Sequence, residues 1–142
     1  MGLLNRLFRR EREPGFTCSA VVPAAGRSTR MGEDKVLLPL GEIPVLIRTL
    51  RALEGCPWIT EIIVAAREDL IVPIGQLCRD AALEKVHKVV VGGETRTESV
   101  LVGIREAAPA AGLIAIHDAA RPLVTYEVIM EVIEAAAQWG AA

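Results

Sequence analysis

The sequence predicts an α/β fold in which helices cover both faces of an open, mostly parallel, Rossmann-like sheet. Three observations support this prediction: four short apolar runs rich in β-branched residues, helical patterns between and after them, and glycine or proline at the joins. A strand that is buried on both faces reads as an apolar run without strict alternation. Repeated strand-and-helix units then favour right-handed crossovers and a parallel sheet.

The four apolar runs are the predicted strands, at residues 18–22, 59–66, 86–91 and 113–116. In an open α/β sheet, ligands bind beyond the carboxyl ends of the strands. We therefore expect the loops after the first, third and fourth runs to meet at one edge of the sheet. The loop after the second run, residues 67–69, has no comparable motif, and the sequence predicts no role for it.

Four sets of apolar residues at helical spacing predict the helices. They are Leu46, Ile47, Leu50 and Leu53; Ile74, Leu77, Cys78 and Ala81; Val100, Leu101, Ile104 and Ala108; and Val128, Ile129, Val132, Ile133 and Ala136. Pro44 and Pro73 precede the first two sets, where proline suits the first helical turn. Thr97 is placed to cap the third helix.

Length and composition favour one domain. With 142 residues, of which 51% are hydrophobic, the chain is long enough to bury a core and too short for two domains. We expect residues 1–15 to form a flexible basic leader and residues 16–142 to form the α/β domain. The leader carries leucines and arginines at helical spacing, so an alternative is that it lies on an anionic surface.

Charge and cysteine content exclude several classes of protein. The net charge of -2, with basic residues gathered in one loop, argues against bulk nucleic-acid binding. Cys18, Cys56 and Cys78 are odd in number and widely spaced, which argues against a disulfide framework or a zinc site. No apolar stretch approaches the roughly 20 residues of a membrane span, and no secretory signal is present. We therefore expect a cytoplasmic protein with reduced thiols.

The first loop combines small residues with positive charge. The small residues are Ala24, Ala25 and Gly26, and the cations are Arg27, Arg30 and Lys35. Small residues let backbone N–H groups approach a phosphate closely, and the cations favour a polyanion. The spacing matches neither a Walker A loop nor a dinucleotide fingerprint, so we predict a longer loop that wraps a triphosphate. The alternative is a glycine-containing connector with solvated arginines.

The other two loops carry longer motifs, GGETRTES at residues 92–99 and HDAARP at residues 117–122. Together with the first loop they closely resemble the 2-C-methyl-D-erythritol 4-phosphate cytidylyltransferases of non-mevalonate isoprenoid biosynthesis. The resemblance runs from about residue 16 to the last residue. Many nucleotidyltransferases share the first motif, whereas the combination of the second and third motifs is found in a much smaller range of proteins.

The resemblance implies a fold, a reaction and partners. The fold is that of the nucleotide-diphospho-sugar transferases, with residues 16–142 as a nucleotide-binding domain. The reaction transfers CMP from CTP to 2-C-methyl-D-erythritol 4-phosphate, which gives 4-diphosphocytidyl-2-C-methyl-D-erythritol and pyrophosphate. The implied cofactor is Mg²⁺, and the implied partners are CTP, a polyol phosphate and a second copy of the chain, without nucleic acid or a membrane span.

By the same resemblance, Arg30 and Lys35 are catalytic, because they would neutralise the charge that builds when the α-phosphate is attacked. Backbone groups of the small residues in the first loop would bind CTP. Arg27 is interpreted as a solvated side chain, since its neighbours already fill both roles.

Gly93, Glu94 and Ser99 match positions that surround the cytosine and ribose in the family, although family members often have Asp where Glu94 stands. Gly93 would allow close approach of the base, and the Ser99 backbone and hydroxyl would supply hydrogen bonds. Arg96 either steers the triphosphate or is a surface arginine at a helix start.

Asp118 follows the fourth strand and is the predicted metal ligand, because a carboxylate there can hold the Mg²⁺ of a nucleoside triphosphate. The alternative for Asp118 is a loop-capping role. His117 is interpreted as a buried strand-end histidine with a structural hydrogen bond. A general base is not required, because the attacking phosphate is already ionised. Arg121 is expected to brace the loop.

The chain also departs from the family. Family members continue beyond the last helix into further strands and an arm that reaches a second subunit, so we expect this sequence to be the N-terminal portion of a longer, C-terminally truncated enzyme. Two alternatives stay open: transfer to another polyol phosphate such as ribitol 5-phosphate, and a non-catalytic fragment that binds CTP.

Overall fold

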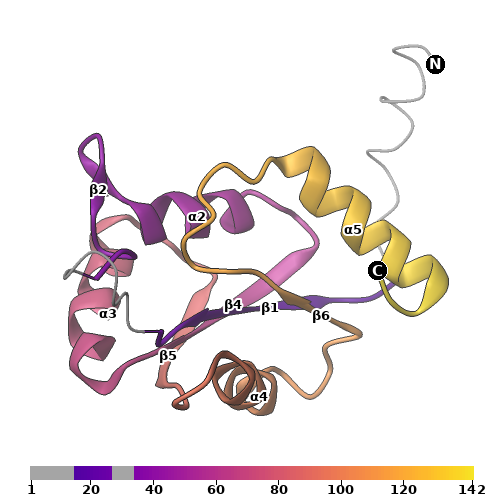
Figure 1. Cartoon of the computed structure of the whole chain (residues 1–142). Helices are drawn as coiled ribbons and strands as arrows, with labels where there is room; N and C mark the ends of the chain where they lie inside the picture. Colours follow the sequence, from indigo (N-terminus) through magenta and orange to yellow (C-terminus); the bar gives the residue numbers. More distant parts are fainter. Residues whose placement is uncertain (1–14, 27–33) are drawn as a thin grey trace.

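The computed structural model describes residues 15–26 and 34–142 and is built around one parallel sheet (Figure 1). Its strands are β1 (Cys18–Ala24), β4 (Ile59–Ala66), β5 (Val86–Val91) and β6 (Leu113–Ile116). They lie in the order β5-β4-β1-β6, and every neighbouring pair is parallel. The predicted strands and the predicted parallel sheet are therefore confirmed.

The strand order reverses at β1. The chain steps from β1 to β4 and then to β5 in one direction, and it returns to place β6 on the other side of β1. Val21 is thus paired with Ile63 on one side and with Ile116 on the other. A reversal of this kind creates the crevice in which doubly wound sheets bind ligands, at the carboxyl ends of β1 and β6.

Helices cover both faces of the sheet, as predicted. They are α2 (Val45–Glu54), α3 (Ile71–Asp80), α4 (Arg96–Glu106) and α5 (Tyr126–Trp139). Buried residues of α2, α3 and α5 form one core cluster with alternate residues of β1, including Ala20 and Val22. The helix α4 lies on the opposite face (Figure 1).

Gly103 allows α4 to approach the sheet closely. A Cβ atom at this position would lie 2.3 Å from Cγ1 of Val21, which is fully buried in β1. That distance is too short for two carbon atoms, so a glycine is required where the helix crosses the strand. The tight contact sets the distance between α4 and the central strand β1.

Two small elements and one helix start were not foreseen. A short hairpin joins β2 (Pro39–Leu40) to β3 (Ile43–Pro44), and the 3-10 helix η2 (Glu68–Leu70) leads into α3. The expectation that Thr97 caps the third helix was wrong. The helix begins two residues earlier than that expectation requires, so Thr95 is the N-cap: its Oγ1 accepts from Glu98 N at 3.1 Å, and Glu98 Oε2 accepts from Thr95 N at 2.9 Å.

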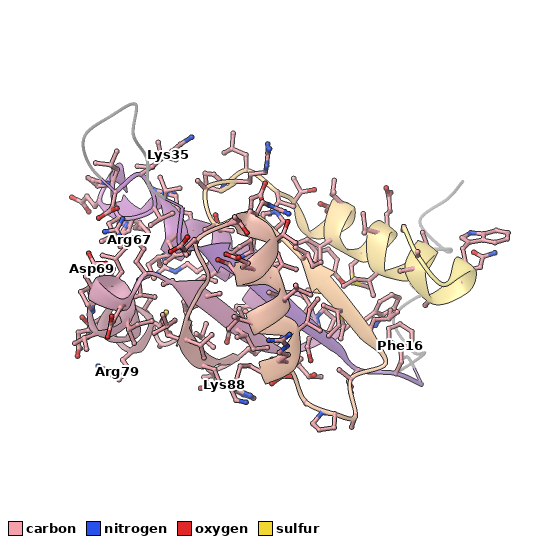
Figure 2. The ribbon with its side chains drawn as sticks, turned by 60° about the horizontal axis from the view of Figure 1, so that its bottom comes forward. Phe16, Lys35, Arg67, Asp69, Arg79 and Lys88 are labelled. Carbon is pink, nitrogen blue, oxygen red and sulfur yellow. The ribbon has the colours of Figure 1, made fainter. Side chains whose placement is uncertain are left out.

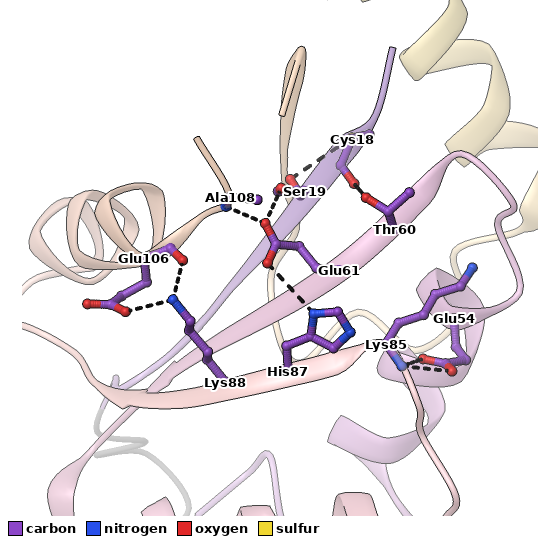
Figure 3. Close-up of polar contacts among 10 residues, drawn as sticks. All are labelled: Cys18, Ser19, Glu54, Thr60, Glu61, Lys85, His87, Lys88, Glu106 and Ala108. Carbon is purple, nitrogen blue, oxygen red and sulfur yellow. Dashed lines mark hydrogen bonds and ion pairs between the residues drawn. The ribbon is translucent and has the colours of Figure 1, made fainter. Parts of the chain in front are cut away.

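A buried carboxylate joins the far end of α4 to the sheet (Figure 3). Glu61 of β4 is 6% exposed, and its Oε1 accepts hydrogen bonds from Ser19 Oγ and from the backbone N of Ala108, just beyond α4. Burial raises the pKa of Glu61, but these hydrogen bonds, together with the nearby His87 and Lys88, outweigh it and hold the pKa below its usual value. The carboxylate therefore stays ionised and anchors the helix.

The cysteines are buried free thiols, as predicted. Burial raises the pKa of Cys18 and of Cys78 to about 11. The thiolate, the reactive form, is therefore scarce at neutral pH. Across the described ranges, no helix combines the length and apolar character that crossing a membrane requires.

Candidate functional site

The loop after β1 and the loop after β5 are in contact. A Cβ atom on Gly92 would lie 2.9 Å from Cβ of Ala25 and 2.7 Å from Oγ of Ser99. The backbone N of Gly92 also donates to the carbonyl of Ala66, at the end of β4, at 2.8 Å. The sheet edge thus brings together the first two predicted motifs.

The loop after β6 joins the same edge through Arg96 and Asp118. The backbone N of His117 donates to the carbonyl of Val21 at 3.0 Å, which extends the β1–β6 ladder and presents the next residue, Asp118, at its end. Arg96, the first residue of α4, donates to Asp118 Oδ1 from Nε at 2.9 Å and from Nη2 at 2.8 Å. Arg121 donates to Oδ2 from Nε at 3.1 Å.

The contacts of Asp118 with Arg96 and Arg121 determine the net charge around the loop after β6. Hydrogen bonding to Arg96 is the largest cause that lowers the pKa of Asp118, and Arg121 adds to it, so the carboxylate is ionised at neutral pH. The side chains of Arg96 and Arg121 remain 61% and 73% exposed. Two guanidinium groups against one carboxylate leave a net positive charge open to solvent, which suits an anionic ligand.

Ser99 shapes the second loop from within. It is only 1% exposed, and its hydroxyl accepts from the backbone N of Gly93 at 3.1 Å and donates to the carbonyl of Thr95 at 3.0 Å. Gly93 has a matching constraint, because a Cβ atom there would lie 2.2 Å from Cβ of Glu98. Glu94 is exposed between them. The predicted nucleotide contacts of these residues remain predictions, and the structure adds a structural role for Ser99.

In the first loop, Ala24 is the buried last residue of β1, Ala25 is half-buried and Gly26 is exposed. Among the described residues, a Cβ atom on Gly26 would meet nothing within 4 Å. Lys35 is also exposed. The predicted cations Arg27 and Arg30 lie outside the described residues.

Sequence reasoning missed Arg67, the residue directly after β4. Its Nη1 and Nη2 donate to the carboxylate of Asp34, with 3.0 Å between Nη2 and Oδ2. Its Nε and Nη2 donate to Asp69 at 3.0 and 2.7 Å. No motif marks Arg67, and the only sequence signal is its position after a strand that ends at the same edge as the three loops.

His117 is half-buried at the end of β6, and burial lowers its pKa, so the neutral imidazole is favoured. Its Nδ1 is buried and has no hydrogen-bond partner within the described part of the chain. The structural hydrogen bond expected for His117 is therefore made by its backbone rather than by Nδ1.

The arrangement of possible ligands bears on the Mg²⁺ site predicted at Asp118. Within residues 15–26 and 34–142, no group of three or more His, Cys, Asp or Glu side chains is placed to hold a metal ion. Mg²⁺ bound to a nucleotide takes one or two protein carboxylates and completes its octahedron with phosphate oxygens and water. Asp118 fits that limited requirement, because within the described part of the chain its Oδ2 accepts one hydrogen bond, from Arg121, which leaves a lone pair for a metal ion.

A doubly wound sheet whose switch point carries small-residue loops and paired arginines defines a nucleotidyltransferase-like α/β domain. The family model of IspD, 2-C-methyl-D-erythritol 4-phosphate cytidylyltransferase, matches residues 18–142. The chain belongs to this family.

Individual relatives agree with the family match. The 2-C-methyl-D-erythritol 4-phosphate cytidylyltransferase of Halalkalibacterium halodurans is 40% identical over 126 residues, which cover 87% of this chain and 55% of the relative. The enzyme of the same name from Caldanaerobacter subterraneus subsp. tengcongensis is 44% identical over 131 residues, which cover 87% of this chain and 56% of the relative. The chain thus spans about half the length of these curated relatives.

A solved structure supports the fold. The crystal structure of 4-diphosphocytidyl-2C-methyl-D-erythritol synthase from Anaerococcus prevotii DSM 20548 is similar with a TM-score of 0.73 and 29% sequence identity. The match covers 85% of this chain and 51% of that chain.

Proposed function

We propose that this protein transfers CMP from CTP to 2-C-methyl-D-erythritol 4-phosphate and releases pyrophosphate. The observation that carries the proposal is the family match over residues 18–142, in a fold that brings the described parts of the matching loops to one edge. The fold supplies the crevice, and the loops supply small residues and positive charge.

In the proposed reaction, a phosphate oxygen of the polyol phosphate attacks the α-phosphorus of CTP. A new P–O bond forms, the bond from the α-phosphorus to the bridging oxygen breaks, and pyrophosphate leaves with that oxygen. The nucleophile is already ionised at neutral pH, so no side chain has to remove a proton. Such transfers depend mainly on positioning and on positive charge around the reacting phosphorus.

Particular residues fit the parts of this reaction. Lys35 and Arg30 would neutralise the triphosphate during attack, as the family resemblance implies. The backbone of residues 24–26 would lie along the nucleotide. Gly93, held by Ser99, would border the base, with Glu94 beside it.

Asp118 would hold Mg²⁺ together with the oxygens of CTP. When bound, the ion would neutralise phosphate charge and orient the triphosphate. Arg96 and Arg121 would keep the carboxylate ionised and in place at the end of β6, which is the role their hydrogen bonds support.

A second candidate is CTP binding without turnover. The sequence leaves this function open beside the transferase. The two functions are separated by titrating the purified chain with CTP and Mg²⁺ in a calorimeter and measuring pyrophosphate release in parallel.

Pyrophosphate release that requires both CTP and 2-C-methyl-D-erythritol 4-phosphate supports the transferase. Release with ribitol 5-phosphate instead reassigns the acceptor, and binding without release supports the second candidate. Absence of CTP binding contradicts both, provided that far-UV circular dichroism shows the chain to be folded. The homodimer implied by the family resemblance is part of the proposal and is tested by sedimentation equilibrium.

A further inference from the structure

Arg67 joins the end of β4 to the residue before Lys35. Its guanidinium binds the Asp34 carboxylate through two nitrogens, and the pair is partly buried, with side chains 21% and 29% exposed. Figure 2 shows Lys35, Arg67 and Asp69 at the same end of the molecule. The contact spans 33 positions of sequence, so it is a tertiary link between two loops.

The donors of Arg67 are already engaged. Nε, Nη1 and Nη2 each donate to a carboxylate oxygen of Asp34 or Asp69. These hydrogen bonds raise the pKa of Arg67, so it is always charged. An arginine held on both sides by carboxylates is poorly placed to bind a phosphate itself. Its hydrogen bonds instead hold the side chains of Asp34 and Asp69 in place.

The negative charge of Asp34 opposes binding of a triphosphate at Lys35, and Arg67 offsets that charge. Its carboxylate is one residue from Lys35, the proposed phosphate-binding cation, and a negative charge there repels a triphosphate. The guanidinium binds this carboxylate through two nitrogens and offsets its charge, although Arg67 also pairs with Asp69. In its partly buried setting the pair is also less screened by salt than an exposed pair.

Backbone hydrogen bonds make the same segment rigid. Leu37 N donates to the carbonyl of Asp34 at 2.8 Å, and Leu46 N, in the first turn of α2, donates to the carbonyl of Val36 at 2.9 Å. Lys35 therefore lies between a residue held by Arg67 and a residue held by α2. Its backbone has little freedom while both anchors are intact.

We propose that Arg67 is a positioning residue for CTP binding: it holds and neutralises Asp34 so that Lys35 meets the triphosphate in a fixed place. This inference rests on the proposed function, because it assigns CTP to Lys35. It adds a residue for which the sequence predicted no role.

The test compares Arg67→Met, Asp34→Asn and the double variant by calorimetric titration with CTP and Mg²⁺. We expect Arg67→Met to weaken CTP binding about tenfold, equal to about 1.4 kcal/mol, because Asp34 is left uncompensated. Adding Asp34→Asn in the same chain should recover the part of that loss that comes from the uncompensated charge. A purely structural role of Arg67 predicts no recovery, since the second substitution removes nothing but a charge.

Lys88→Met is the matched control. Lys88 Nζ binds Glu106 Oε2 at 3.1 Å, at the end of α4 away from Arg96 (Figure 3), so its loss removes a cation and an ion pair far from the nucleotide edge. CTP affinity should be unchanged in this variant. Should Arg67→Met fail to fold, Arg67→Lys, which keeps the charge and loses the two-pronged geometry, takes its place with a smaller expected loss.

Amide hydrogen exchange at Leu37 without CTP separates this inference from the proposed function. We expect faster exchange in Arg67→Met than in the wild type, whether or not the wild type binds CTP. Unchanged exchange overturns the positioning role. So does wild-type CTP affinity in Arg67→Met, or a loss that Asp34→Asn does not recover, whereas a wild type that binds no CTP contradicts the proposed function alone.

Discussion

Arg96 directs two nitrogens at a single oxygen of Asp118, at 2.9 and 2.8 Å, and thereby ties the first residue of α4 to the loop after β6. The other oxygen of Asp118 is bound by Arg121. One carboxylate thus binds two arginines, one from the start of α4 and one from the loop after β6. The net charge left over is positive and lies where the sheet order reverses.

Arg96→Met should lower the rate of the proposed cytidylyl transfer with little effect on stability. The ion pair is exposed, so its loss should change the free energy of unfolding by about 1 kcal/mol or less. Its loss at the reacting edge should cost roughly tenfold in kcat/KM, since Asp118 loses its main partner. Steady-state pyrophosphate release and thermal unfolding measure the two effects. Arg105→Met, at an exposed site in the last turn of the same helix, should leave both unchanged.

Glu61→Gln should reduce stability most at neutral pH. The pKa of Glu61 is below its usual value of 4.5 in the folded chain, so its carboxylate stabilises the fold fully above pH 4.5 and less as the pH falls through the folded pKa. The amide keeps an acceptor for Ala108 and loses the charge, at a cost of about 1–3 kcal/mol at pH 7. Urea unfolding at pH 7 and at pH 3.5 measures the difference.

A gap between wild type and Glu61→Gln that stays constant across this range would show that the carboxylate charge contributes nothing. Glu106→Gln is the control, because the Glu106 side chain is 43% exposed in its ion pair with Lys88. Its pH dependence should differ little from that of the wild type.

Gly103→Ala should push α4 away from β1. The new methyl group would lie 2.3 Å from Val21 Cγ1, which overpacks the interface at a cost of about 1–3 kcal/mol. Because α4 carries Arg96 and Ser99, CTP affinity should fall as well. Gly75→Ala in α3 is the matched control: its Cβ finds the nearest atom at an ordinary 3.6 Å, so the substitution should stabilise the chain by about 0.5–1 kcal/mol. Equal stabilities of the two variants would contradict the tight packing.

Local patterns predicted the fold well. The strands are apolar runs bounded by small or polar residues, and hydrophobic burial on both faces imposes that pattern on any parallel strand. The first and last residues of each element were harder to predict from the sequence. β1 extends through Pro23 to Ala24, beyond the predicted end, since a parallel partner at Ala65 and Ala66 continues the ladder. The β2–β3 hairpin has two residues a strand, too few for periodicity to show.

The site was only partly predictable. The sequence placed the three loops at one edge because parallel strands share their direction. It did not give the pairing of Arg96 with Asp118, 22 positions apart, or of Arg67 with Asp34, because a charged side chain carries no local signal of its tertiary partner. The shift of the helix cap from Thr97 to Thr95 has a similar cause, since two threonines two residues apart offer the same capping oxygen.

The helix α4 is fastened at both ends, by Asp118 at its first residue and by Glu61 just past its last, and Gly103 presses its middle against β1. These three contacts constrain the whole length of the helix. A substitution at the buried Glu61 carboxylate, which holds Ala108, is therefore expected to affect the position of Arg96 at the other end of the helix. In this chain, distance from the proposed nucleotide site is a poor guide to which side chains can be replaced without effect.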